Sequence, residues 1–452
     1  MNKLSPILED AHLKALLDAG VKYAFSAFVD LHGRPKGKCV PVDHLDQMLL
    51  GSELYTGAAL DGVPQNISDD EVAAMPDASR AMQMPWNPQI AWFPSDLYLR
   101  GEPFRADSRG ILKRQLKACA DLGYTFNTGI EPEFYVLKDD GRGPEPVNPA
   151  DSLAKPCYDV RLTLDSFPYV QEIVEAMNGL GWDVYSFDHE DGNGQFEIDF
   201  RYSDALTTAD RITFLKLMVG EICAKHGYFA TWMPKPYGNR TGSGAHLNMS
   251  LADIDTGANL FEAADDPRGL GISTLGYHFI AGVLRHAPAI TAVIAPTVNS
   301  YKRLIKRGAM SGSTWAPVFA CYGNNNRTNM LRVPMGGGRV ECRAADSAMN
   351  VYLGQALVLA AGLEGVREKL DPGEPHRDNL YEYTEEERAA RGIRFLPRTL
   401  GEAIDAFEAD PLSREVFGDE MFGAFAAYKR TEWEEYQNHV SDWEMRRYLR
   451  FL

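Results

Sequence analysis

The segment Gly-Ile-Glu-Pro-Glu-Phe-Tyr-Val, residues 129–136, alternates carboxylate and apolar side chains. Successive side chains of a β-strand point to opposite faces of the sheet, so residues two apart share a face. A strand at this position puts Glu131 and Glu133 on one face and three apolar residues, among them Phe134, on the other. The pattern predicts a strand with one face in a core and two carboxylates on the opposite face.

Two later segments repeat this arrangement. Residues 194–200, Gly-Gln-Phe-Glu-Ile-Asp-Phe, place Glu197 and Asp199 on one face, and residues 338–343, Gly-Arg-Val-Glu-Cys-Arg, place Glu341 between two arginines. Each segment alone is typical of the solvated face of an antiparallel sheet.

The three segments together favour a metal site. Asp188, His189 and Glu190 stand just before the second segment, and like charges gathered on one sheet destabilise it unless cations bind between them. Many carboxylate oxygens, few histidines and no cysteines suit Mg²⁺ or Mn²⁺ better than zinc.

Residues 233–246, Met-Pro-Lys-Pro-Tyr-Gly-Asn-Arg-Thr-Gly-Ser-Gly-Ala-His, add a possible anion site. Glycines let backbone amides approach a carboxylate or phosphate closely. Alone, such a loop is common, and His246 at its end is more often a hydrogen-bonded structural histidine.

Five arginines follow within a short region: Arg303, Arg327, Arg332, Arg339 and Arg343. Guanidinium groups match carboxylate and phosphate oxygens in pairs. Metals with arginines are the parts that phosphoryl transfer requires. A GxxxxGK[ST] loop and a GxGxxG turn between strand and helix are both missing from the sequence, which excludes a P-loop enzyme and a Rossmann dehydrogenase.

The chain has 452 residues, 45% of them hydrophobic. At roughly 100–200 residues per domain, this length predicts two or three domains with a sizeable core. Lys and Arg number 46 against 63 Asp and Glu, a net charge of −17. This balance argues against a nonspecific nucleic-acid binder or an anionic-membrane binder.

Several features predict a cytoplasmic protein without membrane spans. No run reaches the ~18 apolar residues of a membrane helix, and the start, Met1 to Pro6, lacks the apolar core of a signal peptide. Six cysteines without a CxxC pair are expected to be reduced, buried thiols; they are Cys39, Cys119, Cys157, Cys223, Cys321 and Cys342.

A domain boundary is expected near residues 101–108. Before it, runs at 23–29 and 89–93 have strand character. After it, the sequence predicts a helix capped by Ser108 and ended by Gly123, then helices over 168–177 (capped by Ser166), 209–225 and 353–370. The last stretch, 433–448, is expected to be an amphipathic helical tail that packs in the core or contacts another subunit.

The motifs GIEPEF, DHEDGNGQFEI, MPKPYGNRTGSGAH, APTVNSYKRL, GNNNR and GRVECR, in this order, resemble the glutamine synthetase superfamily across nearly the whole chain. Within it, LAKPCYD, DHEDGNGQFEI and STWAPVFACYGNNNR are most similar to the γ-glutamylmethylamide synthetases. The resemblance implies an α+β protein with an N-terminal β-grasp domain (1–104) and a catalytic α/β domain (105–452) around an open funnel of antiparallel strands. It also implies a dodecamer of two stacked rings, with active sites between subunits and the last helix gripping the opposite ring.

Matched by position, the resemblance assigns site residues. Two sets would bind divalent metal, Glu133, Glu190 and Glu197 in the first and Glu131, His246 and Glu341 in the second. The substrate glutamate and the transition state would be bound by Arg303, Arg327, Arg343, Gly242 and Glu131. ATP would be bound by Arg332, Arg339, Ser250 and Asn248, the last of which stands where the family usually has a histidine.

The implied chemistry is ligation. ATP phosphorylates the γ-carboxylate of L-glutamate, and an amine then attacks the acyl phosphate, while the cations and arginines stabilise the developing charge.

Two departures from the family pattern concern the amine. Thr56 stands where ammonium-using members have an aspartate, with Asp61 displaced nearby, and Trp315 replaces the flap glutamate. An indole offers an apolar wall and a cation–π face worth ~0.5–2 kcal/mol, and a buried methyl adds roughly 0.8 kcal/mol. Both suit methylamine. The alternative is that Trp315 only packs its loop, and the proton acceptor stays open between Asp61 and a metal-bound glutamate.

The sequence therefore predicts a glutamate–methylamine ligase that uses ATP and Mg²⁺ or Mn²⁺. Alternatives are a glutamine synthetase, a ligase for ethylamine or a polyamine, a guanidino kinase, and a noncatalytic assembly protein. The complete ligand set argues against the last, and the glutamate-loop and arginine pattern against the kinase.

Overall fold

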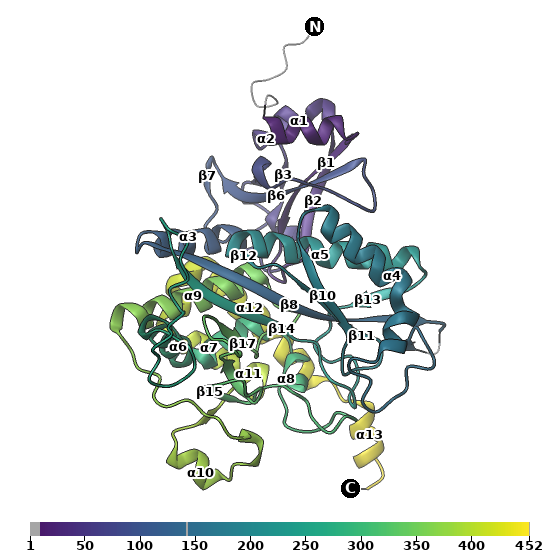
Figure 1. The fold of residues 1–452 in the computed structure, drawn as a ribbon. Coiled ribbons are helices and arrows are strands. Elements are labelled where there is room, and N and C mark those ends of the chain that lie inside the picture. The colour runs from purple at the N-terminus through teal and green to yellow at the C-terminus, as the bar shows by residue number, and fades with distance from the viewer. Residues whose placement is uncertain (1–9, 142, 452) are drawn as a thin grey trace.

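The computed structural model describes residues 10–141 and 143–451, which form two sheets with helices packed on them (Figure 1). The combination confirms the predicted α+β class.

The first sheet has seven strands in the order β2-β1-β6-β4-β3, with β5 and β7 paired to β6. Its strands are β1 (Tyr23–Val29), β2 (Pro35–Pro41), β3 (Leu54–Tyr55), β4 (Val72–Pro76), β5 (Met82–Gln83), β6 (Ile90–Leu99) and β7 (Glu102–Pro103). Helices α1 (Ala11–Asp18) and α2 (Leu45–Leu49) share a small core with this sheet around Leu13, Met48 and Phe93. The predicted strand runs at 23–29 and 89–93 correspond to β1 and the first part of β6.

The second sheet has eleven strands, and the order along its main path is β10-β11-β8-β14-β17-β16-β15-β18. Its long central strand is β8 (Tyr124–Asp139), which contains the predicted strand at 129–136. The others are β9 (Pro144–Pro146), β10 (Val184–His189), β11 (Gln195–Phe200), β12 (Ser203–Asp204), β13 (Phe229–Thr231), β14 (Ala245–Asp253), β15 (Phe319–Gly323), β16 (Asn329–Arg332), β17 (Val340–Cys342) and β18 (Arg394–Phe395).

Three helices, α3 (Ser108–Ala120), α5 (Ala205–Lys225) and α9 (Val351–Glu368), pack against one another, and α3 and α5 also contact β8. Most residues of α9 are buried, and those that are not lie in its last turns. The other helices are α4 (Val160–Gly179), α6 (Thr274–Arg285), α7 (Ala287–Ile294), α8 (Ser300–Arg303), α10 (Glu385–Ala390), α11 (Leu400–Ala409), α12 (Pro411–Asn438) and α13 (Asp442–Tyr448). The apolar faces of β8 and β14 are buried in the main core, which leaves their polar faces for the site.

Arg109, at the start of α3, connects the two sheets. Its guanidinium bonds to Asp210 of α5 at 3.0 and 3.1 Å, to Asp96 of β6 at 2.6 Å and to Asp77, just after β4, at 2.9 Å. The arginine is 2% exposed. One buried cation is thus shared by carboxylates from the N-terminal sheet and from helix α5.

Two predicted helix caps are wrong. Asp107, not Ser108, caps α3, because its carboxylate accepts from the backbone N–H groups of Arg109 and Gly110. Helix α4 begins after Asp159 and runs on to Gly179, so Ser166 is a buried residue inside it. Pro168 lies inside α4, where it removes one backbone hydrogen bond of the helix.

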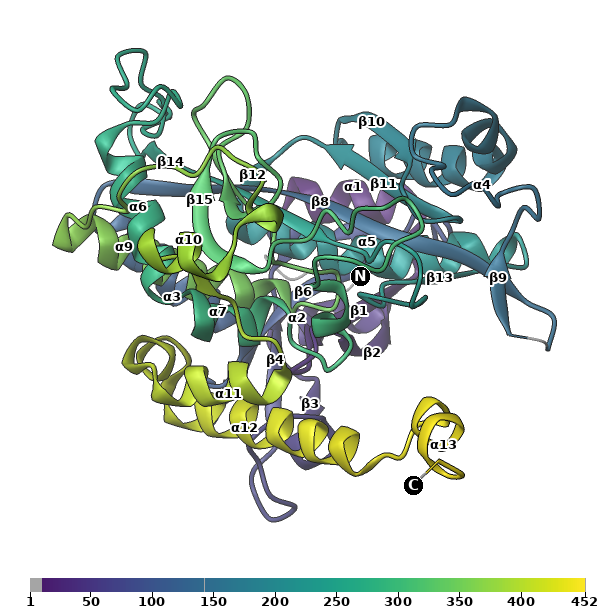
Figure 2. The ribbon, with the colours of Figure 1, turned by 90° about the horizontal axis from the view of Figure 1, so that it is seen from below.

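The C-terminal tail is two helices rather than one. It breaks after Asn438, and Ser441 begins α13 with a reciprocal capping box to Glu444. Trp433 packs on the core, whereas Val440, Trp443 and Tyr448 are exposed, with α13 standing apart from the body (Figure 2). The prediction that the tail packs in the core is therefore wrong for these last residues. The alternative, that they contact another subunit, stays a prediction.

The six cysteines are free, but only four are buried; Cys39 is exposed and Cys157 half-buried, so burial was wrongly predicted for these two. Among the described residues, no helix combines the length and apolar composition needed to cross a membrane. The start from Met1 to Pro6 lies outside the described residues. The division at 104/105 also stays a prediction.

Candidate functional site

The register of four neighbouring strands brings the predicted acidic residues together. Glu197 of β11 stands opposite Glu133 of β8, and His246 of β14 stands opposite Glu131 of β8. On the far side of β14, Asn248 stands opposite Glu341 of β17. Residues separated by up to 210 positions in the chain, from 131 to 341, therefore share one sheet face.

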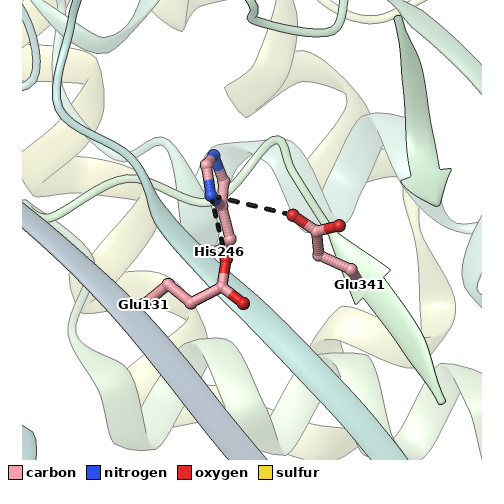
Figure 3. A group of neighbouring side chains, drawn as sticks. All are labelled: Glu131, His246 and Glu341. Atoms are coloured by element: carbon pink, nitrogen blue, oxygen red, sulfur yellow. Dashed lines mark ion pairs between the residues drawn. The ribbon is translucent and has the colours of Figure 1, made fainter. Parts of the chain in front are cut away.

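Two groups of side chains could each hold a metal ion. Glu131, His246 and Glu341 form one (Figure 3), and Glu133, Glu197 and His246 form the other; in each group the ligand atoms lie within 4.8 Å of one another. His246 Nδ1 is 3.4 Å from Glu131 Oε2 and 3.7 Å from Glu341 Oε1, and its Nε2 is 3.7 Å from Glu133 Oε1. The imidazole stands between the two groups.

Glu190 lies close to these two groups but belongs to neither of them. It follows β10 and lines the same pocket as Glu133 and Glu197. Its Oε2 accepts from the backbone N–H of Asp191 at 2.8 Å. The sequence prediction grouped Glu190 with Glu133 and Glu197. In the structure, the third member of that compact group is His246 and not Glu190.

The carboxylates crowd one another. Burial, and then the charge of Glu190, raise the pKa of Glu133 to about 8. Burial, followed by the charges of Glu133 and Glu190, raises the pKa of Glu197 well above its usual value. Buried like charges of this kind favour protons or a divalent cation between them.

Glu341 and His246 have different electrostatics. Burial alone would raise the pKa of Glu341, but Arg343 and then His246 hold it below its usual value. Burial, followed by the charge of Arg343, lowers the pKa of His246 well below its usual range. An ionised carboxylate beside a neutral imidazole is the donor set that a metal ion takes. The residues present therefore fit a divalent metal.

Glu131, Glu133, Glu190 and Glu197 line a pocket of about 480 Å³, which we call the acidic pocket; Glu341 is buried behind its wall. The predicted residues Gly242, Arg303, Arg327, Arg332 and Arg343 and the loop residues Thr314 and Trp315 also line it. Both oxygens of Glu341 are bonded to arginines, Oε1 to Arg343 at 2.5 Å and Oε2 to Arg332 at 2.6 Å. Cations and carboxylates thus face the same space.

Gly242 is required by close packing. A Cβ at this position would lie 2.5 Å from the carbonyl oxygen of Pro234 and 2.8 Å from Cγ of Arg303. The Arg303 guanidinium, in turn, donates to the carbonyls of Ala344 and Arg343. The loop and the arginine fix each other at the wall of the pocket.

A second pocket of about 530 Å³ adjoins the acidic pocket, since Glu131 lines both. The predicted ATP residues Asn248, Ser250 and Arg339 line it. Asn248 donates to Glu131 Oε1 at 2.8 Å and accepts from Arg339 Nε at 3.0 Å. Arg332, assigned to the same ligand, lies in the acidic pocket instead. A ligand spanning both pockets would have one end at the acidic groups.

Trp315 is held over the acidic pocket. Its side chain is 46% exposed, and its backbone has a φ of 55°, in the left-handed region that costs a non-glycine residue energy. The indole N–H donates to Asp191 Oδ2 at 3.3 Å. That contact, together with lining the pocket, gives Trp315 a defined place in it.

Asp191 was missed by sequence reasoning. Its Oδ2 also accepts from Thr241 Oγ1 at 2.6 Å and from Ser311 Oγ at 2.5 Å, so three segments meet at one carboxylate. The available signal was its position directly after Glu190 in DHEDGNGQFEI.

Gln195 was also missed. It donates to Glu133 Oε2 at 3.1 Å and to the Gly242 carbonyl at 3.2 Å, joining a metal-binding group to the glycine loop.

The predicted amine-site residues of the first sheet are not brought to the pocket in this chain. Thr56 follows β3 and contacts Glu71, at 3.3 Å between Thr56 Oγ1 and Glu71 Oε1. Asp61 Oδ2 lies 3.9 Å from His32 Nε2. Neither residue lines the acidic pocket or the adjoining one.

Comparisons with known proteins agree with this geometry. Residues 105–448 match the family "Glutamine synthetase, catalytic domain". The chain is 44% identical to a glutamate–methylamine ligase from Methyloversatilis universalis over 96% of this chain and 97% of that protein. It is 39% identical to a glutamine synthetase from Rhizobium leguminosarum bv. phaseoli, over 94% and 96%. A solved GmaS in complex with ADP superposes with a TM-score of 0.90 at 38% identity, covering 97% of this chain and 99% of that one.

Proposed function

This chain belongs to the glutamine synthetase family, and on that premise we propose that it is an ATP-dependent ligase that joins L-glutamate to methylamine. The products are γ-glutamylmethylamide, ADP and phosphate. The observation that carries the choice of amine is the indole of Trp315, held at Asp191 in the wall of the acidic pocket.

The acidic residues would hold the Mg²⁺ or Mn²⁺ ions that the ligand chemistry favours. Glu131, His246 and Glu341 are suited to one ion, and Glu133, Glu190 and Glu197 to the other. When bound, such ions neutralise phosphate oxygens and stabilise the charge of a transferring phosphoryl group. The adjoining pocket, with Asn248, Ser250 and Arg339, is the place proposed for ATP.

The arginines and the glycine loop are assigned to glutamate and to the phosphoryl group. Arg303 and the backbone at Gly242 are proposed to bind the substrate glutamate, and the wall of the acidic pocket that they share supports this assignment. Arg327 and Arg343 are proposed to stabilise the phosphoryl group on its way from ATP to glutamate, and Arg332 to bind phosphate oxygens. Preorganised cations of this kind lower the barrier because they need not reorient during the reaction.

The reaction proceeds in two displacements. A γ-carboxylate oxygen of glutamate attacks the γ-phosphorus of ATP, ADP leaves, and an acyl phosphate forms. The amine nitrogen then attacks the acyl carbon, and collapse of the tetrahedral intermediate expels phosphate.

The amine must lose a proton before it attacks, since a simple alkylamine resembles lysine, with a pKa of ~10.4. We assign this proton to Asp191, the carboxylate that contacts Trp315 in the acidic pocket. The indole face would receive both the methyl group and the charge of methylammonium, whereas a cage of carboxylates would bind the charge but offer no apolar surface to the methyl group.

We also propose that the working enzyme is an oligomer, with the dodecamer as the family expectation. Thr56 lies outside the acidic pocket of its own chain, so it could act there only from a neighbouring subunit. The exposed aromatic residues of α13 offer a surface that another subunit would cover. Because ATP and glutamate are intracellular metabolites, the cytoplasm is the expected location.

Phosphate release measured in parallel with methylamine, ethylamine, putrescine and ammonia tests the proposal. Methylamine is expected to give the highest kcat/KM. A maximum with ammonia would make the chain a glutamine synthetase, and a maximum with ethylamine or putrescine would make it a ligase for that amine. Absence of amine-dependent phosphate release in metal-loaded protein would favour a noncatalytic assembly role.

A further inference from the structure

A separate cavity of about 320 Å³ lies where the segment after α8 meets β18, and we call it the β18 pocket. Its apolar walls include Leu304, Val318 and Leu396, and its polar lining residues are Tyr301, Lys306 and Arg398. None of these residues lines the acidic pocket or the adjoining one.

Three cations gather around two aromatic rings at this pocket. The rings of Phe319 and Phe395 lie 4.8 Å apart between centroids. Lys306 Nζ is 4.8 Å from the Phe319 centroid, and the guanidinium carbons of Arg388 and Arg398 are 4.8 and 4.0 Å from the Phe395 centroid. The rings therefore hold the three positive charges close together.

These charges lack acidic partners. In the part of the chain that the structure describes, Lys306, Arg388 and Arg398 form no ion pair, although acidic residues outnumber basic ones in the whole sequence. Burial, followed by the charges of Arg388, Arg307 and Arg398, lowers the pKa of Lys306. The mutual repulsion of the three cations is unfavourable, and an anion bound between them would offset it.

A buried polar group at the same place also lacks a partner. The Tyr301 side chain is 7% exposed, and its hydroxyl has no hydrogen-bond partner among the described residues. Buried hydroxyl groups are normally bonded, so an unpaired one calls for a ligand or water. Tyr301 forms part of the wall of the β18 pocket, but its hydroxyl is itself inaccessible, so the ligand contacts are assigned to the cations and not to this hydroxyl.

We propose that the β18 pocket binds a small organic anion, with its carboxylate at Lys306 and Arg398 and its hydrocarbon part against Leu304, Val318 and Leu396. Charge-assisted bonds to Lys and Arg are the strong class of hydrogen bond. The volume is at the small end of the ~300–1,000 Å³ typical of ligand pockets. The mixed apolar and cationic lining selects an amphiphilic carboxylate over an inorganic anion.

The segment that forms this pocket also reaches the acidic pocket. Lys306 follows Arg303 by three residues, and the Thr314 hydroxyl, whose residue lines the acidic pocket, donates to the carbonyl of Ile305. The proposed anion site is thus adjacent to the acidic pocket along the chain, but the two pockets share no lining residue.

Isothermal titration of the full-length protein with hexanoate, without ATP or glutamate, tests the proposal independently of ligase activity. Hexanoate should bind once per chain, and Lys306→Ala and Arg398→Ala should each weaken binding about 10-fold or more. Circular dichroism checks that each variant is folded. Arg394→Ala is the matched control, because it removes an exposed charge from β18 outside the pocket lining.

The outcomes separate the possible binding sites. Arg327→Ala, which removes a cation from the acidic pocket, should leave hexanoate binding unchanged. Equal binding of hexanamide or inorganic phosphate would overturn the proposal, as would unchanged affinity in Lys306→Ala and Arg398→Ala or weakened affinity in Arg327→Ala.

Discussion

Replacing Trp315 with alanine tests whether the indole selects the amine. The side chain lines the acidic pocket beside Asp191. Methylammonium would lose the contact of its methyl group, roughly 0.8 kcal/mol, and a cation–π contribution of ~0.5–2 kcal/mol. The sum of about 1.3–2.8 kcal/mol corresponds to a fall of roughly 10- to 100-fold in kcat/KM for methylamine.

The ratio between two amines is the sharper measure. Ammonium also loses the cation–π contact, so only the methyl contribution differs, and the methylamine-to-ammonia ratio of kcat/KM should fall about fourfold. Trp315→Glu should move the ratio further towards ammonia, because a carboxylate favours the more hydrated cation. Phosphate release at saturating ATP and glutamate provides the assay.

Trp315→Phe is the matched control, since it keeps an apolar ring and a π face and should retain most of the preference. The KM for ATP should stay unchanged, because Trp315 does not line the pocket assigned to the nucleotide. An unchanged amine ratio in Trp315→Ala would refute the reasoning and leave Trp315 with a packing role only.

Three further predictions follow from the site and the fold. Glu133→Ala should abolish ATP turnover while leaving the circular dichroism spectrum native; retained turnover would remove Glu133 from the metal-binding set. Burial and like charges raise the pKa of Glu133 to about 8 and those of Asp188 and Asp199 to about 7. Between pH 5 and 8 the folded state therefore binds more protons than the unfolded state. The stability of the metal-free protein should consequently fall as the pH rises from 5 to 8. Differential scanning fluorimetry in EDTA should show this fall and Mg²⁺ should reverse it, whereas a melting temperature that rises over this range would contradict the electrostatics. Arg109→Ala should lower the free energy of unfolding by about 3–5 kcal/mol, because Asp77, Asp96 and Asp210 lose their shared buried cation and keep only the more exposed Arg80 and Lys113. Urea titration measures this, and a loss below about 1 kcal/mol would show that these two cations and water compensate the three carboxylates.

Alternation along β8, β11 and β17 made much of the acidic face predictable from sequence. A period of two assigns side chains to faces without any knowledge of neighbouring strands, and the apolar positions of Phe134, Phe196 and Val340 are buried as that pattern requires. The order of strands, and hence which glutamates face each other, depends on register, for which sequence reasoning needed the family resemblance.

The errors have local causes. Asp107 and Ser108 can both cap a helix, and only backbone geometry decides between them. Asp191 lies between β10 and β11, where no periodicity applies, so its three hydrogen bonds could not be foreseen. The apolar side of the C-terminal tail was visible as a pattern, but a pattern does not say whether the same chain or another one covers it.

The imidazole of His246 stands between the two carboxylate groups, and this limits how they can be filled. A neutral imidazole has one lone pair on its ring nitrogens and one N–H, so it can serve as ligand to a single ion. If Nδ1 coordinates beside Glu131 and Glu341, Nε2 must carry the proton and can donate it to Glu133. The second ion, beside Glu133 and Glu197, then needs a third ligand other than His246. Glu190, which lines the same pocket, can supply it. One tautomer would thus assign six ligands to two ions, three apiece.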